Sequence, residues 1–185
     1  MKKLKTPVCL LLALVMCLTL TACGGRAVRN RYDAFAAELA GRESLSYTAE
    51  LRAEYPDRSV CFTLRYEKDA GGERVTVLAP ALIEGISARV TEEGTALQYE
   101  GMILDTPPLD PYGLTPMNAL PRLTEALLHG HPDSHWEEDG MTVLRLIPDD
   151  HLTAEVWFRE GMIPARAELA SDGKVSVFLE LNDWS

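Results

Sequence analysis

The chain has 185 residues, of which 46% are hydrophobic and 25% charged, and its formal net charge at pH 7 is −10. This length and this hydrophobic content suit one domain with a sizeable core rather than a disordered segment. The acidic balance argues against binding to nucleic acid, which requires Lys and Arg to neutralise phosphates, and against electrostatic adhesion to anionic lipid.

The first 22 residues have the organisation of an export signal. Lys2, Lys3 and Lys5 precede an apolar run from Val8 to Leu20, and small residues follow that run. This pattern is typical of a secretory signal peptide, and the apolar run is shorter than the ~20 residues of a membrane-spanning helix. We therefore expect residues 1–22 to be removed on export.

The signal ends in Leu20-Thr21-Ala22-Cys23, which resembles the lipobox of bacterial lipoproteins. In that family the Cys thiol is acylated and the Cys becomes the first residue of the mature protein. The resemblance implies that acylated Cys23 anchors the protein to the extracytoplasmic face of the cell membrane, where two or three acyl chains make a stable anchor. The alternative is an ordinary export signal cut nearby, which leaves Cys23 as a free thiol.

Outside the signal and the lipobox, Cys61 is the remaining cysteine, since Cys9 and Cys17 lie within the signal. An intramolecular disulfide is then unavailable, and core packing must hold the fold. Cys61 falls in a segment of alternating apolar and polar residues, which predicts a half-buried, unreactive thiol. A catalytic cysteine would need a nearby His and an electropositive setting.

A short tether is expected at residues 23–27, followed by one domain at residues 28–185. From Val28 to Leu39 apolar residues recur at helical spacing, with charged residues on the other side, and Gly41 follows. This pattern predicts an amphipathic helix that packs on the sheet of its own domain. A membrane-surface role for the helix is the alternative.

Alternation of apolar and polar residues predicts about ten strands. A Pro-rich stretch at residues 105–116 separates them into two groups and predicts an extended loop. A second helix is expected at residues 119–129, with Asn118 as its N-cap and Pro121 in its first turn, and a polar loop at residues 131–139. The expected strands are residues 45–55, 60–67, 74–79, 83–91, 96–99, 102–104, 141–147, 152–159, 163–170 and 174–182.

These elements predict an α+β fold, in which a single curved antiparallel β-sheet forms a half-barrel with two or three helices on its concave side. Their order resembles the LolA/LolB-like lipoprotein-carrier fold, most clearly at residues 45–66 and in the closing hairpins at residues 159–174. Small lipobox-bearing relatives, such as spore germination lipoproteins of the GerS type, look similar in size and anchoring. The resemblance implies an apolar cavity between sheet and helices, and for the germination relatives a partner protein. It carries over no binding residue.

The sequence contains no motif of a nucleotide-binding loop, a serine hydrolase or a zinc protease. His129, His131 and His135 lie close together, but at the end of a helix and in a polar loop, where a zinc site lacks a Cys or carboxylate in register. Asp149-Asp150-His151 is predicted to form a hairpin turn. We expect no catalytic residue, no metal and no cofactor; an enzyme would require a cluster of perturbed acids or histidines in a cleft.

The first functional hypothesis is a binding module that holds a lipid, an acyl chain or an apolar segment of an envelope protein. Its candidate lining residues are Phe62, Leu64, Tyr66, Ile86 and Val90 from the sheet, with Leu120, Leu123 and Leu127 from the second helix. Periodicity alone does not distinguish a lined cavity from a filled core, so core packing is the alternative for each residue.

The second hypothesis is a non-enzymatic scaffold or regulator of an envelope protein, for example a cell-wall enzyme. Trp157 and Phe178 are its candidate contact residues, because they are large aromatic residues on otherwise polar strand faces. A helix or loop that covers them is the alternative. A homodimer is a further option that the sequence leaves open.

Overall fold

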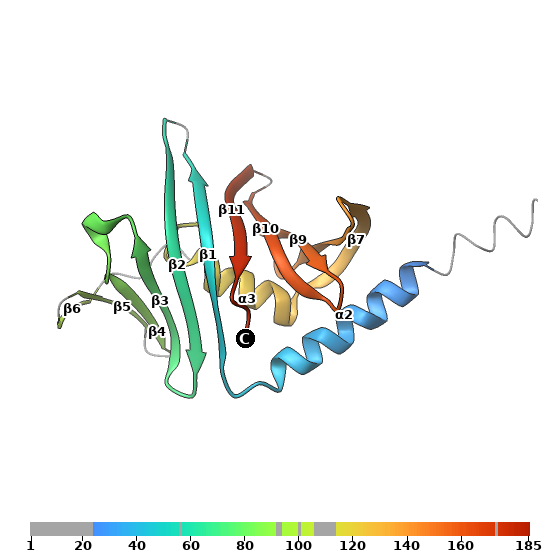
Figure 1. The fold of residues 1–185 in the computed structure, drawn as a ribbon, viewed down its shortest axis with the longest axis horizontal. Helices are drawn as coiled ribbons and strands as arrows, with labels where there is room; N and C mark the ends of the chain where they lie inside the picture. Colours follow the sequence, from blue (N-terminus) through green and yellow to red (C-terminus); the bar gives the residue numbers. More distant parts are fainter. Residues whose placement is uncertain (1–23, 56, 92–93, 100, 106–113, 173) are drawn as a thin grey trace, which may run out of the picture.

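The computed structural model describes residues 24–55, 57–91, 94–99, 101–105, 114–172 and 174–185. The signal peptide and Cys23 lie outside these residues, as does most of the Pro-rich stretch, so the predictions for them stay predictions. Within the described residues the strands form one eleven-stranded antiparallel sheet, in the order β6-β5-β4-β3-β2-β1-β11-β10-β9-β8-β7 (Figure 1).

The elements follow one another in two meanders separated by a helix. The helices are α2 (Gly24–Ala40), α3 (Ala119–His129) and the short 3-10 helix η1 (Ala81–Ile83). The first meander comprises β1 (Leu45–Glu54), β2 (Ser59–Asp69), β3 (Gly72–Ala79), β4 (Ser87–Thr91), β5 (Gly94–Tyr99) and β6 (Met102–Asp105). The second comprises β7 (His131–Glu138), β8 (Met141–Ile147), β9 (Leu152–Arg159), β10 (Ile163–Ser171) and β11 (Lys174–Asn182).

The last strand joins the two meanders, because β11 pairs with β1 in the middle of the sheet. The pairing continues past the strand ends: the backbone N–H of Ser46 donates to the carbonyl of Ser185 at 3.1 Å, and the N–H of Ser185 donates back at 3.0 Å. The two halves of the chain therefore share one continuous sheet and one core.

One face of this sheet, called the inner face here, carries the core and both α-helices. The inner-facing residues of β1 are buried: Leu45, Tyr47, Ala49, Leu51 and Ala53. The side chains of Val28, Tyr32 and Leu39 from α2, and of Leu120, Leu123 and Leu127 from α3, are buried in the same core. Successive strand residues point to opposite sides, so polar residues such as Glu50 and Arg52 lie on the outer face.

The predicted fold class, a single curved antiparallel sheet with helices on one face, is confirmed. Pro121 lies in the first turn of α3 as expected. Asn118 is the N-cap residue, but its side-chain oxygen accepts a hydrogen bond from the N–H of Thr115 at 2.7 Å instead of capping the first turn. The predicted hairpin turn at residues 149–151 joins β8 to β9.

Three expected boundaries were wrong. The polar loop at residues 131–139 is strand β7, whose even-numbered residues, including Pro132 and Trp136, are mostly half-buried. Polar composition hid this alternation, and pairing with β8 supplies the backbone hydrogen bonds. Residues 24–27, expected in the tether, already belong to α2. The strand expected to begin at Ile83 begins at Ser87, because η1 occupies residues 81–83.

Among the described helices, neither α2 nor α3 has an apolar stretch long enough to cross a bilayer.

Candidate functional site

Most of the candidate lining residues lie in the core beneath α3. Leu64 and Tyr66 of β2 have 0% exposure, as do Leu120, Leu123 and Leu127 of α3, and all of them belong to one core cluster. Phe62 and Ile86 are half-buried at the edge of this cluster. The backbone of Val90 belongs to β4, and its side chain lies outside the described part. The seven candidate residues whose side chains are described thus lie in the core cluster or pack against it.

Aromatic side chains tie the sheet to α3. The ring of Tyr47 lies between those of Trp184 and Tyr66, at centroid distances of 4.6 and 4.9 Å. The Tyr47 hydroxyl donates to the carbonyl of Leu120 at 3.0 Å and lies 3.0 Å from the hydroxyl of Thr124. These contacts fix the first turns of α3 against β1.

Tyr66 differs from Tyr47 in that its buried hydroxyl forms no hydrogen bond of standard geometry among the described residues, although Thr124 and Glu73 lie near it. Burial, followed by the negative charge of Glu73, raises the pKa of Tyr66 well above its usual value, so the hydroxyl keeps its proton. A buried hydroxyl without a partner costs free energy. Tyr66 therefore offers a hydrogen-bond donor on the inner face of the sheet.

The inner face continues beyond α3 onto β4, β5 and β6 (Figure 1). Val75 of β3 pairs with Ala88 of β4, which pairs with Leu97 of β5, so these residues point to the same side. Val75 and Ala88 are buried, whereas Leu97 is only half-buried. Two residues further along β5, and so on the same face, Tyr99 is half-buried. It pairs with Met102 of β6, which is 59% exposed.

Leu97, Tyr99 and Met102 lie outside the core cluster that α2 and α3 cover. The backbone of α3 approaches β3, β8 and β10, and Tyr47 links α3 to β1. The described residues therefore leave the inner face of β5 and β6 as an apolar surface that the two helices do not bury.

The outer face carries the two candidate contact residues, each stacked against an arginine. Trp157 of β9 is only 3% exposed, because the guanidinium of Arg166 lies 4.3 Å from its ring centroid. The guanidinium of Arg52 lies 4.1 Å from the ring of Phe178, which is half-buried. The Trp157 ring itself thus offers little surface, whereas Phe178 remains accessible in part.

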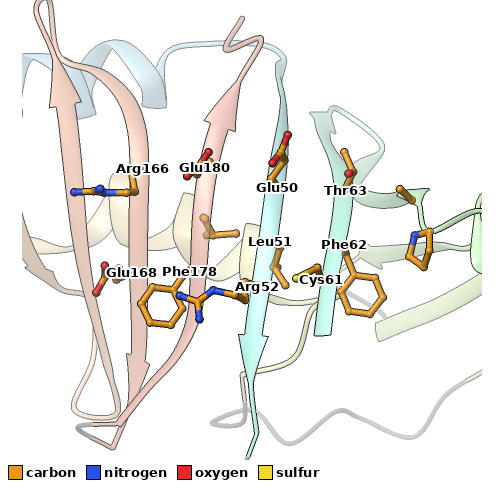
Figure 2. Close-up of a pocket in the computed structure, with 13 residues that line it drawn as sticks. Glu50, Leu51, Arg52, Cys61, Phe62, Thr63, Arg166, Glu168, Phe178 and Glu180 are labelled. Atoms are coloured by element: carbon orange, nitrogen blue, oxygen red, sulfur yellow. The ribbon is translucent and has the colours of Figure 1, made fainter. Parts of the chain in front are cut away.

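A groove of about 540 Å³ crosses the outer face between β3 and β10 (Figure 2). Its polar lining comes mainly from Glu50, Arg52, Arg166, Glu168 and Glu180. Burial, followed by the charge of Glu155, raises the pKa of Glu168 above its usual value. The groove therefore combines charged groups of both signs with the ring of Phe178.

Cys61 also lines this groove, and its side chain is exposed. The prediction of a half-buried thiol was wrong, because Cys61 points to the outer face, opposite Arg52 of β1. The apolar residues that alternate with it face the core instead.

The candidate histidines and the acidic turn at residues 149–151 do not come together in one site. The described residues contain no group of three His, Cys, Asp or Glu side chains that could hold a metal ion. His131 and His135 are exposed residues of β7, and His129 ends α3.

The turn at residues 149–151 is structural. One carboxylate oxygen of Asp149 accepts from the backbone N–H groups of His151 and Leu152, at 2.8 and 2.9 Å, and the other lies 2.6 Å from Arg122 of α3. Burial opposes ionisation of Asp149, but these hydrogen bonds lower its pKa overall. His151 lies 3.0 Å from Asp172 in the neighbouring hairpin. The group therefore joins α3, β8–β9 and β10–β11.

Sequence reasoning missed the outer groove. Its residues are visible in the sequence only as the polar halves of alternating strands. The groove exists because β1 pairs with β11, which brings residues 50–52 beside residues 178–180, and no local pattern specifies such a distant pairing.

No family model matches the chain, and no curated protein matches it in sequence. Solved structures do match. An uncharacterised conserved protein from Thermus thermophilus has 14% identity and a TM-score of 0.50, with 86% of each chain covered. A LolA superfamily protein from Nitrosomonas europaea has 11% identity and a TM-score of 0.44, with 86% of this chain and 92% of that chain covered.

The lipoprotein LppX from Mycobacterium tuberculosis has 12% identity and a TM-score of 0.45, with 86% of this chain and 95% of that chain covered. At such identities the likeness concerns the fold alone. The likeness to the Thermus thermophilus structure is a likeness of overall fold.

Proposed function

We propose that this protein is a lipoprotein of the cell envelope that binds an apolar ligand, a lipid or acyl chain, on the inner face of β3–β6. The observation that carries the proposal is the incomplete burial of Leu97, Tyr99 and Met102. Apolar surface of this kind is typical of ligand or partner sites. An acyl chain on these residues would gain about 0.8 kcal/mol for each buried CH₂ group.

The Tyr66 hydroxyl supports the same placement. Tyr66 pairs with Val75, and through Ala88 the same cross-strand row leads to Leu97. A ligand with an apolar chain on β4–β5 and a polar group toward β2 would point that group along this row toward the Tyr66 hydroxyl, which is fully buried in the unbound protein. Of the original candidate lining residues, Ile86 directly precedes β4 and Val90 belongs to it.

Membrane attachment is the second part of the proposal. The lipobox resemblance implies acylation of Cys23, one residue before α2 begins at Gly24. Because α2 packs against α3 and the sheet, an anchor at Cys23 would hold the domain close to the membrane. The proposed role is non-catalytic, with the protein presenting or carrying an apolar ligand at the envelope.

Native mass spectrometry tests the ligand directly. Protein produced without detergent as residues 24–185 should carry a co-purifying mass of lipid size, which delipidation removes and added lipid restores. An apo mass that stays unchanged after lipid is added would contradict binding. The alternative role, a scaffold for an envelope protein, rests on the outer face and does not require a bound lipid.

A further inference from the structure

Two carboxylates face each other across the central strand pair of the sheet. Glu50 of β1 lies directly opposite Glu180 of β11, and both side chains are exposed on the outer face. Directly opposed like charges destabilise a strand pair. In Figure 2 the two side chains lie next to each other at one end of the groove.

The neighbouring arginines do not neutralise this pair. Arg166 lies opposite Glu180 in the register of β10 and β11, yet its guanidinium stacks on Trp157 and lies 3.6 Å from Glu138. Figure 2 shows the Arg166 side chain pointing away from Glu180. Arg52 stacks on Phe178 and forms an ion pair with Glu54. Over the described ranges, neither Glu50 nor Glu180 forms an ion pair.

The rest of the groove is partly apolar. Pro80 and Phe178 line it together with the carboxylates. The groove thus offers a negative subsite beside an apolar one, within a volume of about 540 Å³ that admits side chains of a second protein.

We propose that this groove docks a segment of a partner protein that carries a Lys or Arg side chain beside an apolar side chain. The cationic group would lie between Glu50 and Glu180 and relieve their repulsion, and the apolar group would contact Phe178 and Pro80. The charge of the pair selects a cationic segment, and the apolar lining selects a protein over a free metal ion. This inference is independent of the proposed lipid ligand, which lies on the opposite face of the sheet.

Cys61 permits a site-specific test, because its exposed thiol lines the groove. The full chain, in neutral detergent micelles, is equilibrated under mildly reducing conditions with three short peptides. Each peptide carries an N-terminal thiol, supplied as its mixed disulfide with 2-mercaptoethanol, and a leucine, and the three differ at one adjacent position, which is lysine, norleucine or glutamate. Attack of the Cys61 thiolate on this disulfide forms the conjugate and releases 2-mercaptoethanol. Thiol–disulfide exchange then reports the relative affinity of each peptide for the groove. Peptide mass spectrometry separates conjugates at Cys61 from those at other cysteines.

Capture of the lysine peptide at Cys61 should exceed that of the glutamate peptide by about fivefold, as expected for an exposed ion pair. The E50Q/E180Q variant should lose this preference. The E43Q/E160Q variant removes the same charge from exposed positions outside the groove and should keep it.

Equal capture of the three peptides by the wild-type protein would overturn the proposal without relying on any variant. An unchanged preference in E50Q/E180Q would overturn it as well, since the selectivity would then come from the overall acidity of the protein. A preference for norleucine over lysine would identify the groove as purely apolar, which also contradicts a cationic partner.

Discussion

The hydroxyl of Tyr32 in α2 lies 2.9 Å from the carbonyl oxygen of Gly130, just past the end of α3. The same hydroxyl lies 3.2 Å from the carbonyl oxygens of Ala126 and Leu127 in the last turn of α3. The single proton of this hydroxyl is best placed for the Gly130 carbonyl, because the Ala126 carbonyl already accepts from the backbone N–H of Gly130 at 2.9 Å. This contact fastens the helix next to the proposed lipid anchor to the body of the domain.

The substitution Tyr32→Phe should therefore destabilise the protein. It leaves a buried carbonyl at the end of α3 without its side-chain donor, and we expect a loss of about 1–2 kcal/mol in the free energy of unfolding, measured by urea denaturation. Tyr55→Phe is the matched control, because Tyr55 packs at the edge under Arg58. A loss no larger than that of the control would show that the helix end is satisfied in another way.

Arg166 should protect the indole of Trp157 from solvent. Arg166→Ala removes the guanidinium that covers the ring, so the indole N–H of Trp157 should exchange hydrogen with water faster, and stability should fall by about 1 kcal/mol. Nitrogen-edited NMR measures the exchange, with Trp157→Phe to assign the signal. Arg159→Ala, at an exposed position at the end of β9, serves as control. Unchanged exchange in Arg166→Ala would mean that other side chains cover the ring.

Glu168 should lower the stability of the protein as pH rises. Its pKa is raised above the usual 4.5 by burial and by Glu155, so the native state binds the proton more tightly than the unfolded state does. Its destabilising effect is therefore absent at low pH and develops as pH rises through the usual and then the raised pKa. Glu168→Gln should raise the Tm at pH 7 and leave it unchanged near pH 3.5. An equal shift at both pH values would contradict this cause.

The alternation of apolar and polar residues predicted most of the sheet, because burial of one face imposes a period of two on each strand. Residues 45–54 and 174–182 show how well this works, since apolar residues recur there without interruption. Strand β7 was missed because its half-buried positions carry Pro132, Ser134 and Trp136 rather than aliphatic residues. A composition rich in His, Asp and Glu then resembles a loop.

The candidate site was predictable only in part. Apolar positions on the inner face were identified from periodicity, but the pattern does not say which of them α3 buries and which it leaves half-exposed, as it leaves Leu97. The opposition of Glu50 and Glu180 depends on the register between the first and last strands. Long-range register follows from the packing of the whole sheet and leaves no local signal in the sequence.

Cys23→Ala should release the protein from membranes in folded form. The acidic domain has no electrostatic attraction to anionic lipid, so acylation at Cys23 would be its main attachment. Cell fractionation should find the variant in the soluble fraction, with the urea midpoint of the domain unchanged. Retention of Cys23→Ala on washed membranes would instead point to a partner protein that holds it there.

Titration of a fluorescent fatty acid into residues 24–185 tests the central claim most directly. Leu97→Glu places a charge on the inner face, and Gln98→Glu places the same charge on the outer face one residue away. We predict saturable binding to the unmodified domain and to Gln98→Glu, and binding weaker by about tenfold or more in Leu97→Glu, because an apolar ligand would bury an unpaired charge. Absence of saturable binding, or equal affinity in the two variants, would contradict a lipid site on this face.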